Sequence, residues 1–223
     1  MARSPMTADT PQPQSQRLPI GGTSVQNRIA DAAIELFYSR GAYATTVRDI
    51  TAACGLTPGA LYNHFSSKEQ LLFVLIRDVH LLADLDLVAA VTAAGPDPVA
   101  RLAAAVRSLI SHAAAPRKQA RVANREYVTL TDARRREITA LRRQLRSRFS
   151  EVLLAGSQDG TFVLPGGHGP TAAALTANVI STICANISEW TQENYPMTLS
   201  ELQQTYVQMA LRLAGATRPL QER

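Results

Sequence analysis

Apolar side chains recur along most of the chain at intervals of three and four residues, which is the spacing of one face of an α-helix. No alternation of apolar and polar residues lasts longer than a few positions, so strands are not expected. The pattern predicts an all-α fold whose first helix begins at Ser24 and ends in a left-handed cap at Gly41. The apolar stripe of that helix consists of Val25, Ile29, Ala33, Leu36 and Phe37.

Three helix-start signals follow the first helix within a short stretch. The segment TVRD (46–49) is a capping box, in which a Thr side chain and an acidic side chain three residues later satisfy each other's backbone N–H groups. Thr57 can cap a short helix that ends near Phe65, because Pro58 at its first position has no N–H to leave unsatisfied. The segment SSKE (66–69) is a second capping box and predicts a long fourth helix.

The rest of the chain also has a helical pattern, after a Gly-Pro-Asp-Pro break at 95–98. Gly and Pro cluster again in the loop GTFVLPGGHGP. The elements expected beyond the break are apolar helical stripes at 99–110 and 138–152, the second ending near Gly156, a loop at 160–170, and helices at about 171–193 and 199–214.

The two short helices that begin at Thr46 and Thr57, joined at a glycine-containing turn, have the dimensions of a helix-turn-helix. In that unit the second helix enters the DNA major groove with its N-terminal residues toward the bases. Small residues at 58–60 let the backbone approach DNA closely, and the N–H groups at a helix start favour phosphate. Leu61 and Phe65 would face inward. The side chains left to meet DNA are Tyr62, Asn63, His64 and Lys68.

The segment TTVRDITAACGLTPGALYNHFSSKEQLL closely resembles the DNA-binding segment of TetR-family repressors. The shared features are a Thr-Thr pair, an Ile-Ala-x-x-x-Gly core in which Thr51 and Cys54 replace the commoner alanines, Leu-Tyr-x-His-Phe and Lys-Glu-x-Leu. With the first helix the resemblance covers residues 24–72. It implies a base-reading role for Arg48. It also implies DNA contacts at the other matched positions, Thr46, Thr57, Pro58, Gly59, Tyr62, Asn63, His64 and Lys68.

The resemblance further implies a homodimer that leaves a palindromic operator when a small effector binds. We therefore expect a disordered tail at 1–22, a three-helix DNA-binding bundle with its helix-turn-helix at 23–70, and an effector-binding and dimerisation domain at 71–223. The last two predicted helices, 171–193 and 199–214, carry the small and apolar residues suited to a four-helix dimer interface.

The charge is unevenly distributed. The chain carries a net +5, yet residues 24–70 hold four basic and four acidic groups, whereas residues 117–148 hold eleven basic and three acidic ones, a net of +8. A basic run outside the DNA-reading segment is typical of a solvated helix face. It also suits a ligand that carries phosphate, because guanidinium groups bind phosphate in a fork.

Residues 120–215 loosely resemble the C-terminal domain of the KstR-like TetR subgroup, whose members respond to acyl-CoA thioesters. Where that subgroup has Trp-Tyr-Arg, this chain has Trp190-Thr191-Gln192. The resemblance implies an acyl-CoA effector; the alternative is a neutral hydrophobic compound or drug. Each candidate effector residue could equally be structural or solvated. The candidates are Arg121, Arg125, Arg142, Arg146, Asn178 and Trp190.

Other classes of function find little support. The most apolar stretch, residues 71–91, is interrupted by four charged residues, and the polar N-terminus is no secretion signal, so we expect a cytoplasmic bacterial protein without a membrane partner. Cys54 and Cys184 are expected to be buried apolar residues, and no cofactor or metal set is apparent. A protein that senses a metabolite without reading DNA stays open. An enzyme using His64 or His168 is disfavoured, since neither histidine has a nucleophile or acid at suitable spacing.

Overall fold

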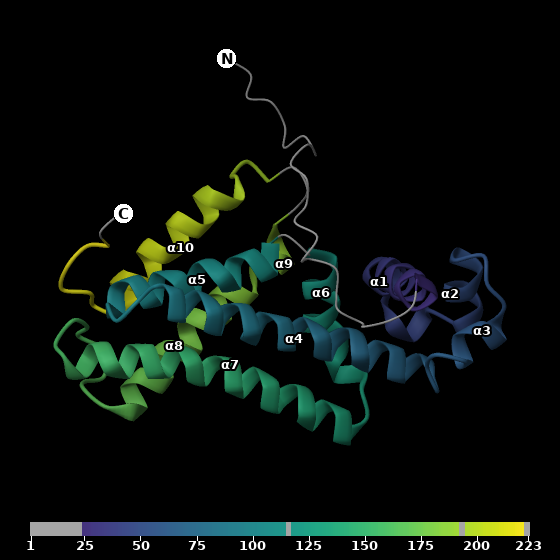
Figure 1. Cartoon of the computed structure of the whole chain (residues 1–223), viewed down its shortest axis with the longest axis horizontal. Helices are drawn as coiled ribbons and strands as arrows, with labels where there is room; N and C mark the ends of the chain where they lie inside the picture. Colours follow the sequence, from purple (N-terminus) through teal and green to yellow (C-terminus); the bar gives the residue numbers. More distant parts are fainter. Residues whose placement is uncertain (1–23, 115–116, 192–194, 221–223) are drawn as a thin grey trace, which may run out of the picture. The chain divides into compact units, whose positions relative to one another are not determined.

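The computed structural model describes residues 24–114, 117–191 and 195–220, so the predicted tail at 1–22 lies outside the described residues. The predicted all-α fold is confirmed. Apart from an isolated antiparallel bridge between Phe162 and Ala216, the described residues contain no β-structure. The elements (Figure 1) are α1 (Ser24–Ala44), α2 (Val47–Ala53), α3 (Pro58–Tyr62), α4 (Lys68–Ala93), α5 (Pro98–Ala114), α6 (Arg117–Glu126), the 3-10 turn η2 (Tyr127–Thr129), α7 (Asp132–Gln158), α8 (Pro170–Ala185), α9 (Ile187–Trp190) and α10 (Leu199–Leu213).

The described residues form two compact units, each with its own hydrophobic core. The N-terminal unit consists of the described residues within 12–82 and 116–141, and the C-terminal unit of those within 83–115 and 142–223. Helices α4 and α7 therefore each contribute to both units. The N-terminal unit is assembled from two separate stretches of sequence.

The core of the N-terminal unit joins α1, α2, α3 and the first turns of α4 to α6 and the start of α7. Ile29, Ile50 and Leu61 are completely buried in it, and so is Ile138 of α7. On α6, Val122 and Ala123 belong to the same cluster. The three-helix bundle predicted from residues 23–70 is present, and a second stretch of chain completes its core.

Basic side chains of α6 lie against α1 at the edge of this core. The Lys118 ammonium donates to both carboxylate oxygens of Glu35, at 2.7 and 2.6 Å. The Lys118 ammonium and the Arg121 guanidinium also lie over the Tyr38 ring, at 5.8 and 5.5 Å from its centre. Exposed ion pairs and cation–π contacts are each worth about 1 kcal/mol or less, so burial of Val122 and Ala123 is the main attachment of α6.

The three helices predicted around the turn begin where expected, but two of the predicted capping hydrogen bonds differ. The Thr46 capping box is confirmed, with both of its reciprocal hydrogen bonds. Thr57 occupies the cap position of α3 with Pro58 behind it, but its side chain accepts no capping hydrogen bond. The cap of α4 is Ser67 rather than Ser66, because the Ser67 hydroxyl accepts from the Gln70 N–H at 3.0 Å.

Two helix ends also differ from expectation. Gly41 has φ 83° and ψ 158°, so it breaks α1 with a positive φ as predicted, but in an extended conformation rather than a left-handed cap. Helix α3 ends at Tyr62 instead of near Phe65, since the His64 N–H turns back to the Leu61 carbonyl. His64 therefore lies beyond the end of α3.

In the C-terminal unit, α5 packs against α8 and α10, and its predicted stripe from Val99 to Ile110 is buried as expected. Helix α7 continues past Gly156 to Gln158. Gly156 is required there because a Cβ would lie 2.3 Å from the Phe162 ring. The predicted 160–170 loop is confirmed, and its Phe162 is fully buried.

The two last predicted helices need correction in detail. The single helix expected at 171–193 is divided at Asn186 into α8 and the short α9, and residues 192–193 lie outside the described residues. The helix expected at 199–214 is present as α10, with a capping box at Thr198. Of its predicted stripe, Leu202 and Tyr206 are buried, whereas Met209 and Leu213 are exposed.

Candidate nucleic-acid interface

Helices α2 and α3 form the predicted helix-turn-helix (Figure 1). Ile50 and Leu61 hold the two helices on the core, both with no exposed surface, and Phe65 is 4% exposed. At the turn, the Cys54 thiol donates to the Ile50 carbonyl at 2.9 Å, and burial raises the thiol pKa. The inward-facing side of the motif is therefore fixed as the sequence pattern predicted.

The start of α2 is held by a closed set of hydrogen bonds. The Thr46 N–H and hydroxyl both donate to the Asp49 carboxylate at 2.8 Å, and the Thr46 hydroxyl accepts from the Asp49 N–H at 3.1 Å. Arg40 adds an ion pair to Asp49 at 2.8 Å. The hydrogen bond from the Thr46 N–H contributes most to holding the Asp49 pKa below its ordinary value. Thr46 is thus a cap in this structure, and the residue is exposed at the surface.

The opposite side of the motif is an exposed polar surface. Tyr62 is 55% exposed, and His64, which follows the helix end, is half-buried. The other sequence-predicted contacts that lie exposed on α2, on α3 or next to them are Thr46, Arg48, Thr57, Pro58, Gly59 and Asn63. An exposed surface with this many polar groups, over a base that is buried and mostly apolar, is suited to a hydrogen-bonding partner.

Gly59 leaves open space at the start of α3. A Cβ at Gly59 would meet only the Thr57 hydroxyl, at 4.0 Å, and Gly59 does not have a positive φ. Neither packing within the protein nor backbone conformation therefore requires glycine there. A molecule that approaches the helix start from outside would give such a requirement.

Lys68, a predicted phosphate contact, also donates hydrogen bonds within the protein. Its ammonium donates to the carbonyls of Ala42 and Thr45 at 2.5 and 2.6 Å, and so ties the start of α4 to the turn before α2. An ammonium has three N–H groups, so two are used within the protein. Its neighbour Glu69 accepts from the Thr131 N–H at 3.0 Å at the start of α7.

Three arginines of the basic run 134–148 form ion pairs with acidic side chains. Arg134 pairs with Glu69 and lies over the Phe73 ring at 5.3 Å. Arg135 pairs with Asp132 in its own helix, and Arg148 pairs with Asp84 at 3.4 Å. These three guanidinium groups serve ion pairs inside their own units. Two of the candidate effector residues, Arg142 and Arg146, are half-buried on α7.

The six candidate effector residues fall into both units. Arg121, which donates to the Tyr38 hydroxyl at 3.3 Å, and Arg125 belong to α6 in the N-terminal unit. The other four lie in the C-terminal unit, where Asn178 is exposed on α8 and Trp190 packs edge-on against Tyr195 with 5.0 Å between ring centres. Arg121 therefore already has a place in the α1–α6 contact.

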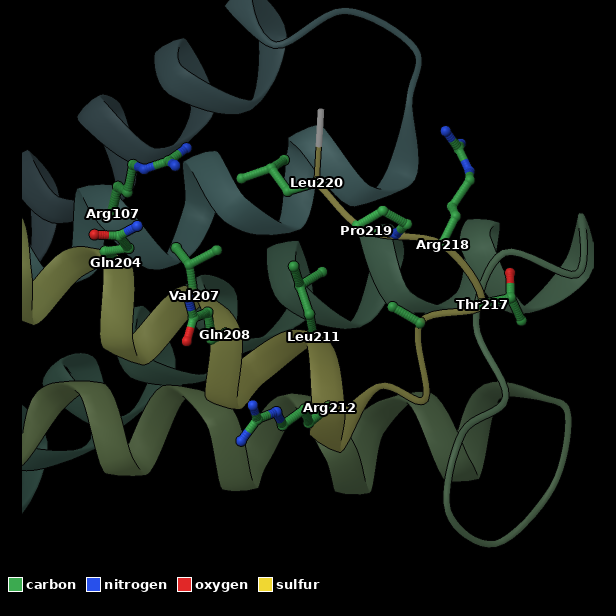
Figure 2. Close-up of a pocket in the computed structure, with 11 residues that line it drawn as sticks. Arg107, Gln204, Val207, Gln208, Leu211, Arg212, Thr217, Arg218, Pro219 and Leu220 are labelled. Atoms are coloured by element: carbon green, nitrogen blue, oxygen red, sulfur yellow. The ribbon is translucent and has the colours of Figure 1, made fainter. Parts of the chain in front are cut away.

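Figure 2 shows a groove of the C-terminal unit, about 490 Å³ in volume, that contains none of these six residues. It lies between α10, α5 and the segment that follows α10. Val207, Leu211 and Leu220 supply apolar walls, and Arg107 lies at one end beside Gln204. Arg218, at the other end, is occupied by an ion pair with Asp97. No signal in the sequence pointed to this groove.

The remaining reactive side chains are constrained by their surroundings. Cys184 is fully buried, which raises its pKa to about 12, and both cysteines are free and buried as predicted. His168 does have a partner that the sequence did not reveal, since its Nδ1 lies 3.1 Å from the Ser157 hydroxyl. Ser157 is itself 5% exposed, so the contact ties the 160–170 loop to α7. In the described part of the chain, no three His, Cys, Asp or Glu side chains gather as a metal site does.

Both α8 and α10 leave apolar side chains exposed. Leu175 and Val179, one turn apart on α8, are 58% and 40% exposed, and Met209 and Leu213 of α10 are 46% and 36% exposed. Among the described residues, one stretch, Pro170–Trp190, is long and apolar enough to cross a membrane, and its apolar window is 50% buried inside the protein. Buried core helices have the same composition.

Comparisons with known proteins agree with this geometry. Residues 29–75 match the family of bacterial regulatory proteins described as the tetR family, and residues 95–214, more than half of the chain, match the tetracyclin repressor-like C-terminal domain. The HTH-type transcriptional repressor KstR2 of Rhodococcus jostii (strain RHA1) is 34% identical over 152 residues, which are 64% of this chain and 70% of that protein.

Solved structures extend the similarity over most of the chain. The ketosteroid transcriptional regulator KstR2 of Mycobacterium tuberculosis superposes with a TM-score of 0.76 at 25% identity, covering 89% of this chain and 97% of that one. AibR, in complex with isovaleryl coenzyme A and operator DNA, gives 0.71 at 26% identity, covering 86% and 99%. The helix-turn-helix and the helices after it are thus shared with DNA-binding regulators.

Proposed function

Because the chain belongs to the tetR family of bacterial transcriptional regulators, we propose that it is a homodimeric repressor that binds a palindromic operator and is released by a small effector. The observation that carries the proposal is the exposed polar surface of α2 and α3 on a fully buried base. Within it, residues 23–70 read DNA, and residues 71–223 provide the effector site and the dimer contact.

DNA recognition begins with α3 in the major groove and α2 across the DNA backbone. Arg48 has an exposed guanidinium, which can donate two hydrogen bonds to guanine. The open space at Gly59 admits a phosphate or base edge to the helix start. The remaining contacts, to phosphates, sugars or base edges, come from Thr46, Thr57, Pro58, Tyr62, Asn63, His64 and Lys68.

The dimer forms through α8 and α10, which correspond to the predicted helices at 171–193 and 199–214. Support comes from the exposed apolar pairs Leu175/Val179 and Met209/Leu213. Burying side chains of this kind contributes roughly 1.5–3 kcal/mol each at most. A dimer presents two recognition helices to two half-sites, which makes a palindromic operator the expected target.

The proposed effector is an acyl-CoA thioester of lipid or sterol breakdown. Support comes from the likeness to KstR2 and to AibR, a protein solved with isovaleryl coenzyme A, and from basic side chains that suit phosphate. Arg142, Arg146, Asn178 and Trp190 of the C-terminal unit are proposed as effector contacts, and Arg121 and Arg125 of α6 stay candidates from the sequence alone. A neutral hydrophobic effector is the competing outcome.

DNA binding is tested by fluorescence anisotropy with duplexes from the region upstream of the protein's own gene. We expect one duplex to bind specifically, and Arg48→Ala to weaken binding to it by about 10- to 100-fold for each half-site, the discrimination that one bidentate base contact supplies. Arg136→Ala, an exposed arginine of α7 outside the motif, is the control and should change little. Equal binding by wild type and Arg48→Ala would remove Arg48 from the interface.

The effector is tested on the same complex with matched ligands. CoA thioesters, the corresponding free acids and neutral hydrophobic compounds are each added to the protein–operator complex, and release is measured. Thioesters alone should release the protein, and they should also raise its melting temperature, since a ligand at 100 times its Kd adds about 2.7 kcal/mol of stability. Equal release by free acids and thioesters would refute a role for the CoA phosphates.

A further inference from the structure

Tyr43 is the most exposed aromatic side chain in the described residues, with 97% of its surface open to solvent. It lies between the break of α1 at Gly41 and the start of α2. Its ring packs against nothing in the N-terminal unit, so it adds nothing to the core. The family motif did not draw attention to this position.

The backbone on both sides of Tyr43 is nevertheless fixed. The Thr45 hydroxyl donates to the Gly41 carbonyl at 2.8 Å, and the Thr45 side chain is completely buried. The Lys68 ammonium donates to the carbonyls of Ala42, which precedes Tyr43, and Thr45, which follows it. Ala42 is itself 4% exposed. A turn held at both ends presents its tyrosine from a constant position.

The position of this turn places Tyr43 next to the helix that is expected to lie on DNA. It leads directly into α2, the first helix of the helix-turn-helix, and in such units the first helix crosses the DNA backbone. Thr46, three residues further on, is exposed at the α2 start. Tyrosine hydroxyls are regular donors to DNA phosphate oxygens, and contacts of this kind position the protein without reading sequence.

On the basis of the proposed function, we propose that Tyr43 is a further DNA contact, whose hydroxyl donates to a backbone phosphate beside each operator half-site. The turn arrives preorganised, so little freedom is lost when the hydrogen bond forms. Because the donor is uncharged, the contact displaces no counterion. The contact therefore strengthens binding to operator DNA and to non-operator DNA alike.

The test compares wild type with Tyr43→Phe and Tyr43→Ala on the operator duplex and on a scrambled duplex across a salt series. We expect both variants to bind both duplexes more weakly by a similar factor, about 100-fold, because one hydrogen bond to a charged group is worth roughly tenfold and the dimer makes it twice. The slope of log affinity against log salt should stay at the wild-type value. Val128→Ala, which trims another exposed side chain of the N-terminal unit, is the matched control and should bind as wild type does.

The outcomes separate this inference from the proposed function. If wild type binds its operator and Tyr43→Phe binds equally well, the phosphate contact is overturned alone. A loss confined to Tyr43→Ala overturns it too, because the ring rather than the hydroxyl would then matter. Failure of wild type on every duplex overturns the proposed function and this inference together. Unchanged melting temperatures exclude misfolding, as a 97% exposed side chain predicts.

Discussion

Gly59→Ala should affect the stability of the protein and its affinity for DNA in opposite directions. The added Cβ meets only the Thr57 hydroxyl, at 4.0 Å, an ordinary van der Waals distance. Alanine is favoured over glycine in a helix interior by up to about 1 kcal/mol. We therefore expect an unchanged or slightly raised melting temperature. Stability alone gives no reason for glycine at this position.

DNA binding should respond in the opposite direction. A methyl group at the start of α3 holds the backbone N–H groups away from DNA, and the loss of one hydrogen bond to a charged phosphate costs about 1.5 kcal/mol, roughly tenfold. A dimer loses this contact in two half-sites, so the combined loss is about 100-fold. Fluorescence anisotropy on the operator duplex at one fixed salt concentration measures it.

Gly156→Ala is the matched control, because it makes the same change in a helix of the C-terminal unit. There the new Cβ would lie 2.3 Å from the Phe162 ring and 2.9 Å from Pro98. Overpacking of this kind costs about 1–3 kcal/mol, more than the gain in helix propensity, so the melting temperature should fall. Operator affinity of Gly59→Ala within twofold of wild type would refute close approach at the α3 start.

Three further predictions follow from individual side chains. Leu175→Glu places a charge on the exposed apolar face of α8 and should convert the proposed dimer to monomer, as measured by light scattering after size exclusion. Asp49 has a lowered pKa, so its stabilising effect is present above the unfolded pKa of about 3.9 and is lost as pH falls through the folded pKa; Asp49→Asn should therefore destabilise the protein at pH 7 and less so near pH 3. The Cys184 thiol, fully buried with a pKa of about 12, should react with a thiol reagent only after unfolding.

Local signals made the helix-turn-helix predictable. The Thr46 capping box involves residues only three apart. Pro58 favours a helix start through its own missing N–H and fixed φ, which depend on no distant residue. Where two local readings competed, sequence could not choose. Ser66 and Ser67 both offer a hydroxyl to the start of α4, and only the folded turn shows that Ser67 uses it.

Contacts between distant residues could not be predicted. Glu69 fits a capping box in the sequence, yet its carboxylate accepts from Thr131, which is 62 residues away. The basic run did not show that Arg134 and Arg148 have acidic partners, because these partners, Glu69 and Asp84, lie on another element. The DNA-contact residues and the six effector candidates stay predictions, since their partners are other molecules.

The discontinuous core of the N-terminal unit has a consequence for protein engineering. Repressor chimaeras are conveniently made by grafting an N-terminal DNA-reading fragment from one regulator onto the sensor of another. A graft ending at residue 70 would leave behind part of the core that holds the reading helices. The residues lost would be Leu71, Leu72, Phe73, Leu75 and Ile76 of α4, together with Val122, Ala123, Leu130 and Ile138. The transplanted fragment would then have to pack on foreign side chains. A graft that extends to residue 82 and also carries residues 117–141 transfers the whole of this core, and we expect it to fold with less loss of stability.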